Sequence, residues 1–197
     1  MKRFLFAMMF LASGLLCAGQ DAEALGKIGG FTLYGVDFSQ TEVFAADETA
    51  DEFINAFEGI NILLLRERDK YVGTLEKKLG KTAIKTNLTS VIGALDSIDR
   101  SSLVTLSGVS RLSQEQIEAA VERLDTGDDS GTGLLVVADY LDKSRAVGAY
   151  TFVFFDIATR QIITSWKQDG NAMGFGLRNY WAGSLHYAIR HIRISGK

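Results

Sequence analysis

Apolar and polar positions repeat with different periods along the chain, and these periods predict an order of strands and helices. Residues 31–38 alternate apolar with small or polar side chains, which predicts a first strand. The residues after the capping-box sequence at Thr49 repeat apolar side chains at helical spacing, so we expect a helix with one buried face. The charged stretch 66–70 is expected to end or bend this helix. A second helical segment is expected from Tyr71 to a cap at Gly80.

Residues 81–100 fit two interpretations, and the sequence leaves both open. Their apolar positions suit either a single helix or a strand followed by a helix. After them, residues 103–106 predict a short strand, and a second capping-box sequence that begins at Ser113 predicts a helix. The apolar side chains behind this capping box form one stripe: Ile117, Ala120, Val121 and Leu124. The polar residues 125–133 predict a flexible loop.

The last third of the chain predicts three strands and a closing helix. Apolar strands are expected at 134–140 and 149–157, and a more polar strand, typical of a sheet edge, at 161–167. The short connection 158–160 predicts that the last two strands pair as a hairpin. The closing helix is expected from about Leu177, with an inner face made of Trp181, Leu185, Ala188, Ile189 and Ile192. We therefore expect an α/β sandwich, with helices packed on a mixed sheet of about four to five strands.

The start of the chain has the order of a secretory signal. A basic beginning, Met1–Arg3, precedes the apolar stretch Phe4–Cys17, and small residues follow at Ala18 and Gly19. The apolar stretch is shorter than the roughly 20 residues that a membrane-spanning helix needs. We therefore expect residues 1–19 to be a signal peptide and the rest of the chain to be exported.

The expected domain organisation follows from this signal. Residues 20–30 are expected to be an N-terminal extension and residues 31–197 a single α/β domain, because this length suits one core. We expect such a chain to work outside the cytoplasm. Cys17, the one cysteine of the chain, is either lipidated or removed with the signal. Leu16 before it departs from the small residue usual in a lipidation sequence, and cleavage one or two residues later fits signal-peptide rules better.

Composition limits the classes of partner. Hydrophobic residues make up 47% of the chain and charged residues 23%, as in ordinary globular proteins, and the formal net charge is −3. A mildly acidic chain has no general electrostatic attraction to nucleic acid or to an anionic membrane surface. We therefore expect no nucleic-acid partner, and membrane association only through a lipidated Cys17.

Part of the last third resembles a recurring design of periplasmic domains. The resemblance lies in the strands Gly133–Tyr140 and Tyr150–Phe155, in the turn and strand Asp156–Ile163, and in the final helix. These segments resemble the curli-secretion lipoprotein family, the outer-membrane activators of penicillin-binding proteins and the amino-terminal domain of the periplasmic Tol translocation protein. The turn Ala158–Arg160 lacks the glycine usual in those proteins. The resemblance implies a fold and no catalytic residue.

The chain is also similar to an uncharacterised family of exported proteins from Gram-negative bacteria. Residues 35–39 and 174–181 carry this similarity, which extends over most of the chain after the signal. It implies export to the periplasm of a Gram-negative bacterium or association with its outer membrane, and it implies neither an activity nor a catalytic residue.

The glycine-rich residues 170–176, directly before the closing helix, form a candidate ligand site. Exposed N–H groups at a helix start can hold an anion, so Gly174 and Gly176, with Arg178 beside them, are candidates for anion binding. The stretch lacks the third glycine of a dinucleotide-binding motif, since Asn179 stands there, and it lacks the Walker lysine. We favour the interpretation that it is a flexible connection.

Charged residues near strand ends supply further candidates. Asp139 and Lys143 follow a hydrophobic strand, where α/β folds often build ligand sites, although such residues are more often turn formers. An enzyme site would require the fold to bring together Asp37, Asp139, Asp142 and Arg178.

We expect no metal site and no cofactor. His186 and His191 are five positions apart, which places them on different faces of a helix. The loop acids Asp125, Asp128 and Asp129 do not follow the spacing of a calcium-binding loop.

The sequence therefore predicts an exported, non-enzymatic domain that binds an envelope protein or a peptidoglycan-associated component. One alternative is a periplasmic enzyme built on the acid cluster. The other is a binder of a small anionic ligand at the glycine-rich stretch.

Overall fold

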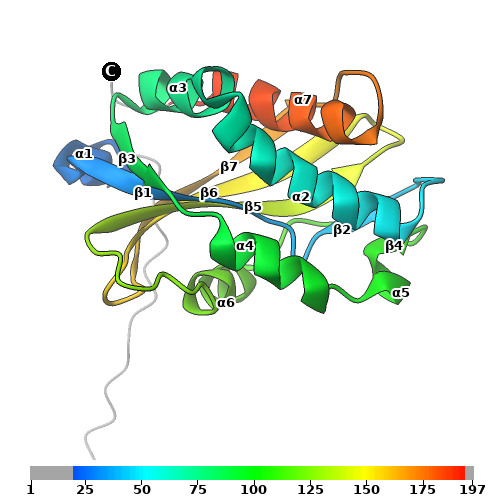
Figure 1. Ribbon diagram of the computed structural model, residues 1–197, viewed down its shortest axis with the longest axis horizontal. Helices are drawn as coiled ribbons and strands as arrows, with labels where there is room; N and C mark the ends of the chain where they lie inside the picture. The colour runs from blue at the N-terminus through cyan, green and yellow to red at the C-terminus, as the bar shows by residue number, and fades with distance from the viewer. Residues whose placement is uncertain (1–19, 194–197) are drawn as a thin grey trace, which may run out of the picture.

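A seven-stranded mixed sheet lies between two layers of helices in the computed structural model, which describes residues 20–193 (Figure 1). The α/β class predicted from the sequence is confirmed. The predicted signal peptide, with Cys17, lies outside the described residues. Within residues 20–193, none of the helices combines the length and the apolar character that crossing a bilayer requires.

The sheet is organised around its longest strand, β5. Its strands are β1 (Gly30–Asp37), β2 (Glu42–Phe44), β3 (Thr82–Thr86), β4 (Val104–Thr105), β5 (Thr132–Asp142), β6 (Val147–Asp156) and β7 (Ile162–Asn171). Strand β6 runs antiparallel along one edge of β5, while β1 and β2 lie end to end, both parallel to β5, along the other. Strands β3 and β4 extend the sheet beyond β1 and β2, and β7 extends it beyond β6.

The predicted number of strands is too low. The seven strands of the described chain share five positions across the sheet, because β1 and β2 occupy one position and β3 and β4 the next. Strand β2 is three residues long, too short to show an alternating period. Strand β3 lies in the stretch 81–100 that the sequence left open; the structure has a strand followed by helices there.

The helices form the two outer layers. They are α1 (Gln20–Lys27), α2 (Ala50–Arg66), α3 (Arg68–Leu79), α4 (Thr89–Gly93), the 3₁₀ helix η1 (Ala94–Ser97), α5 (Arg100–Leu103), α6 (Gln114–Glu122) and α7 (Leu177–Arg190). Helices α2, α3 and α7 cover one face of the sheet, and α4 and α6 lie on the other, with α5 at the rim (Figure 1).

The predicted helix boundaries are confirmed where the sequence carries capping residues. Thr49 and Ser113 both form complete capping boxes at the starts of α2 and α6. Helix α2 ends at Arg66, inside the charged stretch expected to end or bend it, and α3 follows almost at once. Gly80 caps α3 with a φ of 65°, the left-handed conformation that glycine adopts without strain.

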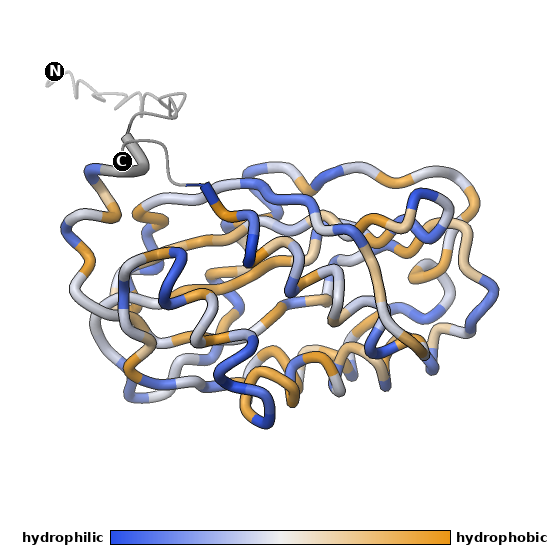
Figure 2. The backbone as a smooth tube through the Cα atoms, turned by 90° about the horizontal axis from the view of Figure 1, so that it is seen from above, coloured by the Kyte–Doolittle hydropathy of each residue, from blue (hydrophilic) through white to orange (hydrophobic). Residues whose placement is uncertain are grey.

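The core is continuous through all three layers. In β5 every residue from Gly133 to Asp142 is buried, as expected for a central strand. Phe38 stacks on Phe57 of α2 with ring centroids 4.1 Å apart, and Trp181 of α7 is fully buried. Figure 2 shows hydrophobic positions along the central strands and hydrophilic ones at the outer turns.

The buried side chain of Asn61 makes the hydrogen bonds that a neighbouring strand would otherwise make to part of β1. The pairing of β1 with β3 ends at Leu33. Beyond that residue, the side chain of Asn61 of α2 lies along the unpaired edge of β1. Its Oδ1 accepts from Val36 N at 2.8 Å and its Nδ2 donates to Val36 O at 2.9 Å, so both backbone groups are satisfied. Gly35, at a φ of 87°, leaves room, because a Cβ there would lie 2.6 Å from Asn61 Oδ1.

Two segments are more firmly attached than the sequence suggested. In the expected N-terminal extension 20–30, α1 contacts β7, and Leu25 and Ile28 are buried in the common core. The loop 125–133 is not flexible around Asp129, since this carboxylate accepts hydrogen bonds from Tyr34, Lys85 and Asn87.

Candidate functional site

A groove of about 470 Å³ runs between α7, the loop that precedes α7 and the joint between α2 and α3. We call it the α3–α7 groove. Its walls carry Lys70 and Tyr71 from α3, Phe175 from the loop, and Arg178, Asn179 and His186 from α7. The sequence-predicted candidates Gly174 and Arg178 both line it.

The loop before α7 is packed tightly against the helix. A Cβ on Gly183 would collide with the carbonyl oxygen of Met173, and a Cβ on Gly170 would collide with the carbonyl oxygen of Ser184. A Cβ on Gly174 would lie 2.7 Å from Asn179 O. The prediction of a flexible connection is therefore wrong. Gly170, Gly174 and Gly183 permit close packing of backbone on backbone, which explains them without a bound anion, whereas Gly176 has open space around it.

Hydrogen bonds also fix this loop. The N–H of Met173 donates to Tyr180 O at 3.2 Å, and Asn179 Nδ2 donates to Phe175 O at 3.2 Å. Gly176 stands at the N-cap of α7 without a side-chain cap. A rigid loop thus enters the helix with its side chains in set directions.

This rigid loop displays two large apolar side chains to solvent. Phe175 is 95% exposed and Met173 is 59% exposed. Both line the α3–α7 groove. Exposed aromatic and methionine side chains at the rim of a groove are typical of interaction surfaces, because they are buried when a partner binds.

Positive charge lies beside these apolar residues. Arg178 crosses α2 at Gly59, where a Cβ would lie 2.6 Å from Arg178 Cδ, and its guanidinium donates to Asn179 Oδ1. Among the described residues, no carboxylate pairs with Arg178. Lys70 forms an ion pair with Glu67 at 2.7 Å, and this hydrogen bond raises the pKa of Lys70.

His186 lines the groove beside Tyr71. Its ring meets Tyr71 edge-on, with centroids 5.5 Å apart. Burial lowers the pKa of His186, and the charges of Lys70 and Arg190 lower it further. His191 lies elsewhere, stacked on Tyr187 with centroids 3.9 Å apart.

Asp139 is a structural residue of the sheet. It is 1% exposed and accepts hydrogen bonds from Thr151 Oγ1 at 2.9 Å and from Arg111 Nη1 at 2.6 Å. Burial raises the pKa of Asp139, while the bonds from Thr151 and Arg111 oppose that rise. Arg111 also pairs with Asp169, so it ties the loop before α6 to the sheet.

The other predicted residues stabilise turns. Asp37 Oδ1 accepts from Ser39 N at 2.8 Å, and Asp142 accepts from Ser144 and Arg145 at 2.6 Å each. Lys143 pairs with Glu48 at 2.6 Å.

The structure does not assemble the acid cluster proposed for an enzyme. Asp37, Asp139 and Asp142 each bind different partners, as described above. Tyr150 bonds Ser184 of α7, so its neighbour Thr151, with Asp139, faces the opposite side of the sheet from Arg178. The expectation that these four residues converge is wrong, because Asp139 faces away from Arg178 while Asp37 and Asp142 are held in separate turns.

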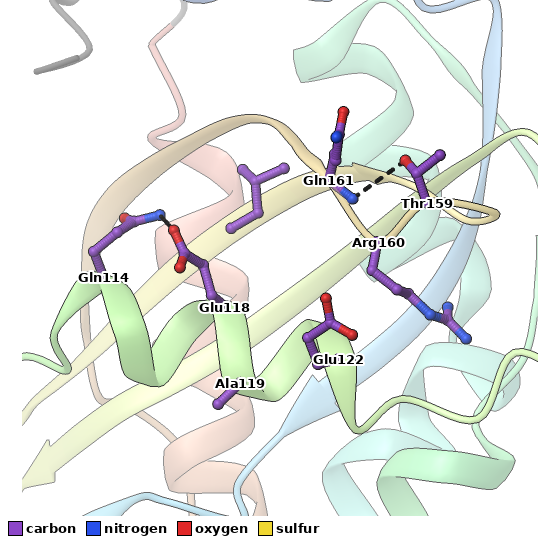
Figure 3. Close-up of a pocket in the computed structure, with 8 residues that line it drawn as sticks. Gln114, Glu118, Ala119, Glu122, Thr159, Arg160 and Gln161 are labelled. Atoms are coloured by element: carbon purple, nitrogen blue, oxygen red, sulfur yellow. Dashed lines mark hydrogen bonds between the residues drawn. The ribbon is translucent and has the colours of Figure 1, made fainter. Parts of the chain in front are cut away.

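A second groove, of about 490 Å³, lies between α6 and the β6–β7 turn; we call it the α6 groove. Figure 3 shows Glu118 and Glu122 along α6, facing the turn that carries Arg160. Arg160 has a φ of 61°, the conformation for which the usual turn glycine is suited, and its Nη2 donates to Thr126 Oγ1 at 2.9 Å. Sequence reasoning missed this groove, because it forms only when the hairpin folds beside α6.

Comparison with protein-family models, with curated proteins and with solved structures finds no match for this chain. The resemblances stated above therefore stay predictions.

Sequence reasoning also missed the roles of Phe175 and Met173. Two apolar residues inside a glycine-rich stretch form no helical or strand period, so nothing in the local pattern separates a buried residue from a displayed one. The one available signal was their position directly before a helix whose inner face was already complete.

Proposed function

We propose that the protein is an exported, non-enzymatic binding domain that holds a protein of the cell envelope in the α3–α7 groove. The observation that carries this proposal is Phe175, a 95% exposed aromatic side chain on a rigid loop at the rim of that groove. The predicted signal sequence supports export.

Rigidity favours binding. A partner that covers Phe175 and Met173 removes apolar surface from water, at roughly 25 cal/mol per Å². Because the loop is already packed against Gly183 and Asn179, little conformational entropy is lost on binding. Preformed aromatic anchors of this kind typically supply most of the binding energy at protein interfaces.

Charge indicates the chemistry of the partner. Arg178 is exposed and unpaired with any carboxylate in the described chain, and Lys70 lies on the opposite wall. A segment with apolar side chains to cover Phe175 and carboxylates to reach Arg178 fits both features.

The absence of converging acids in the described residues supports a binding role over catalysis. Asp139 is buried under Arg111 and Thr151, and it lines neither groove. A small-anion site at the start of α7 has less support, since close packing explains Gly170, Gly174 and Gly183.

Site-specific photocrosslinking in cell envelopes tests the proposal. A photoreactive phenylalanine analogue in place of Phe175 is expected to crosslink one defined envelope protein, and Arg178→Glu is expected to reduce the yield about tenfold, as a lost charge pair of about 1.4 kcal/mol would.

Leu106 provides the matched control. It is 82% exposed and lies outside the α3–α7 groove, so the same analogue there should give none of this product. Equal yields at positions 175 and 106, or no product at 175, would overturn the proposal.

A further inference from the structure

Strand β7 leaves a long backbone edge unpaired. Within residues 20–193 it pairs with β6 and with no other strand, over the ten residues Ile162–Asn171. The chain has no proline, and the β6–β7 register is shifted only between Phe154 and Phe155, so the stretch 164–171 runs without a bulge. Open edges of this kind are templates for another strand.

Antiparallel pairing determines which groups of β7 face outward. Ala172 N donates to Ala146 O at 2.7 Å, which continues the β6–β7 ladder. Since successive residues direct their N–H and C=O groups to opposite edges, the even-numbered residues 166–172 bond to β6 and the odd-numbered residues 165–171 point outward. The side chain of Gln168 agrees with this, as its amide donates to the outward carbonyl of Asp169 at 3.2 Å.

The side chains of β7 are complementary to themselves about Gln168. A second β7, antiparallel and related by a two-fold axis at Gln168, sets Lys167 opposite the partner's Asp169. Lys167 is exposed and forms no ion pair within the described residues. The side chain of Asp169 is 59% exposed, and Arg111 holds it in place. Opposite charges directly across a strand pair stabilise it.

We propose that β7 binds β7 of a second copy of this chain, antiparallel and centred on Gln168, so that two sheets join into one. A two-fold match of charge about one residue favours a second copy over an unrelated strand, because an unrelated strand needs no such internal symmetry. This surface is separate from the α3–α7 groove, so the inference does not depend on the proposed function.

Single cysteines test both the dimer and its register, in a chain whose own thiol is removed by Cys17→Ser. In Gln168→Cys the two thiols face each other in a non-hydrogen-bonded pair, with Cα atoms about 4.5 Å apart, within disulfide range. In Ser165→Cys they lie about 20 Å apart. We expect mild oxidation to yield at least ten times more covalent dimer from the first variant than from the second.

A double cysteine variant tests whether the crosslink lost in Ser165→Cys can be restored in the proposed register. Ser165 faces the partner's Asn171, so Ser165→Cys combined with Asn171→Cys is expected to restore the crosslink. In sedimentation equilibrium we expect the unsubstituted chain to be dimeric. Lys167→Glu sets a glutamate opposite the partner's Asp169, so it should raise the dimer dissociation constant at least tenfold. Far-ultraviolet circular dichroism confirms that each variant is folded.

Two results would overturn the inference. One is a monomeric mass for the unsubstituted chain throughout the accessible concentration range. The other is equal disulfide yield from Gln168→Cys and Ser165→Cys, which would indicate random collision rather than a defined register.

Discussion

The two grooves of this domain are nearly equal in volume and opposite in character. The α3–α7 groove, at about 470 Å³, displays Phe175 and Met173 beside Arg178. The α6 groove, at about 490 Å³, is lined by polar side chains, among them Glu118 and Glu122, and carries none of the largely exposed large apolar residues of the described chain.

The two grooves differ in how much a bound partner would stabilise them. In the α6 groove, Gln114 bonds Glu118 and Arg160 Nη2 bonds Thr126, so most of these polar groups already have partners, although Arg160 Nη1 has none. In the α3–α7 groove, apolar surface is held in water by a rigid backbone. Groove volume alone therefore does not identify a binding site, whereas apolar side chains that are held exposed to water do.

The largest expected effect comes from disturbing the rigid loop. Gly183→Ala places a Cβ against the Met173 carbonyl and is expected to lower the free energy of unfolding by about 3 kcal/mol. Gly73→Ala is the matched control in α3, where the nearest atom is 3.8 Å away, and it should raise that free energy by about 0.5–1 kcal/mol. Urea titrations measure both, and equal changes would contradict the close packing.

Removal of the aromatic anchor is expected to affect binding and not stability. Phe175→Ser should change the free energy of unfolding by less than about 0.5 kcal/mol, because the side chain is exposed. Its affinity for the partner found by crosslinking should fall about 30-fold, the effect of losing an anchor of about 2 kcal/mol. Leu106→Ser serves as the control in calorimetric titrations, where similar losses for both variants would count against an anchor at Phe175.

Charge reversal in each groove sharpens the comparison further. Arg178→Glu is expected to weaken binding about tenfold at low ionic strength, and less at high salt, because exposed charges are screened. Glu118→Arg in the α6 groove is expected to leave binding unchanged. The comparison would fail if the two reversals had the same effect, or if salt had none.

The smallest expected effect concerns pH. Burial lowers the pKa of His186 below its ordinary value of 6.5, so between that lowered pKa and 6.5 the unfolded chain binds more protons than the folded one. Stability should therefore be steady above pH 6.5 and fall as the pH drops below it. His186→Gln should flatten this fall in melting temperatures measured from pH 7.5 to 5; an unchanged slope would show that other groups cause it.

The fold was largely predictable because its elements carry local signals. Capping boxes at Thr49 and Ser113, the glycine cap at Gly80 and the long apolar strands near the end of the chain all marked real elements. Strand β2 and its position end to end with β1 were not predictable, since three residues show no period and their pairing depends on distant parts of the chain.

The candidate site was predictable only in part. Gly174 and Arg178 were selected for anion binding, and the structure places both in the α3–α7 groove. The reason for Gly174 was different, since its contact with Asn179 arises from tertiary packing. Lys70 and His186 meet there only because α3 packs beside α7, and no spacing in the sequence encodes that contact.

The account rests on the loop before α7 being preformed in the free protein, and amide hydrogen exchange measures this directly. The N–H of Met173, bonded to Tyr180 O, and the N–H of Tyr180, bonded to Gly176 O, are expected to exchange at least about a hundredfold more slowly than in an unstructured peptide. Exchange of both at the rate of an unstructured peptide would contradict the account.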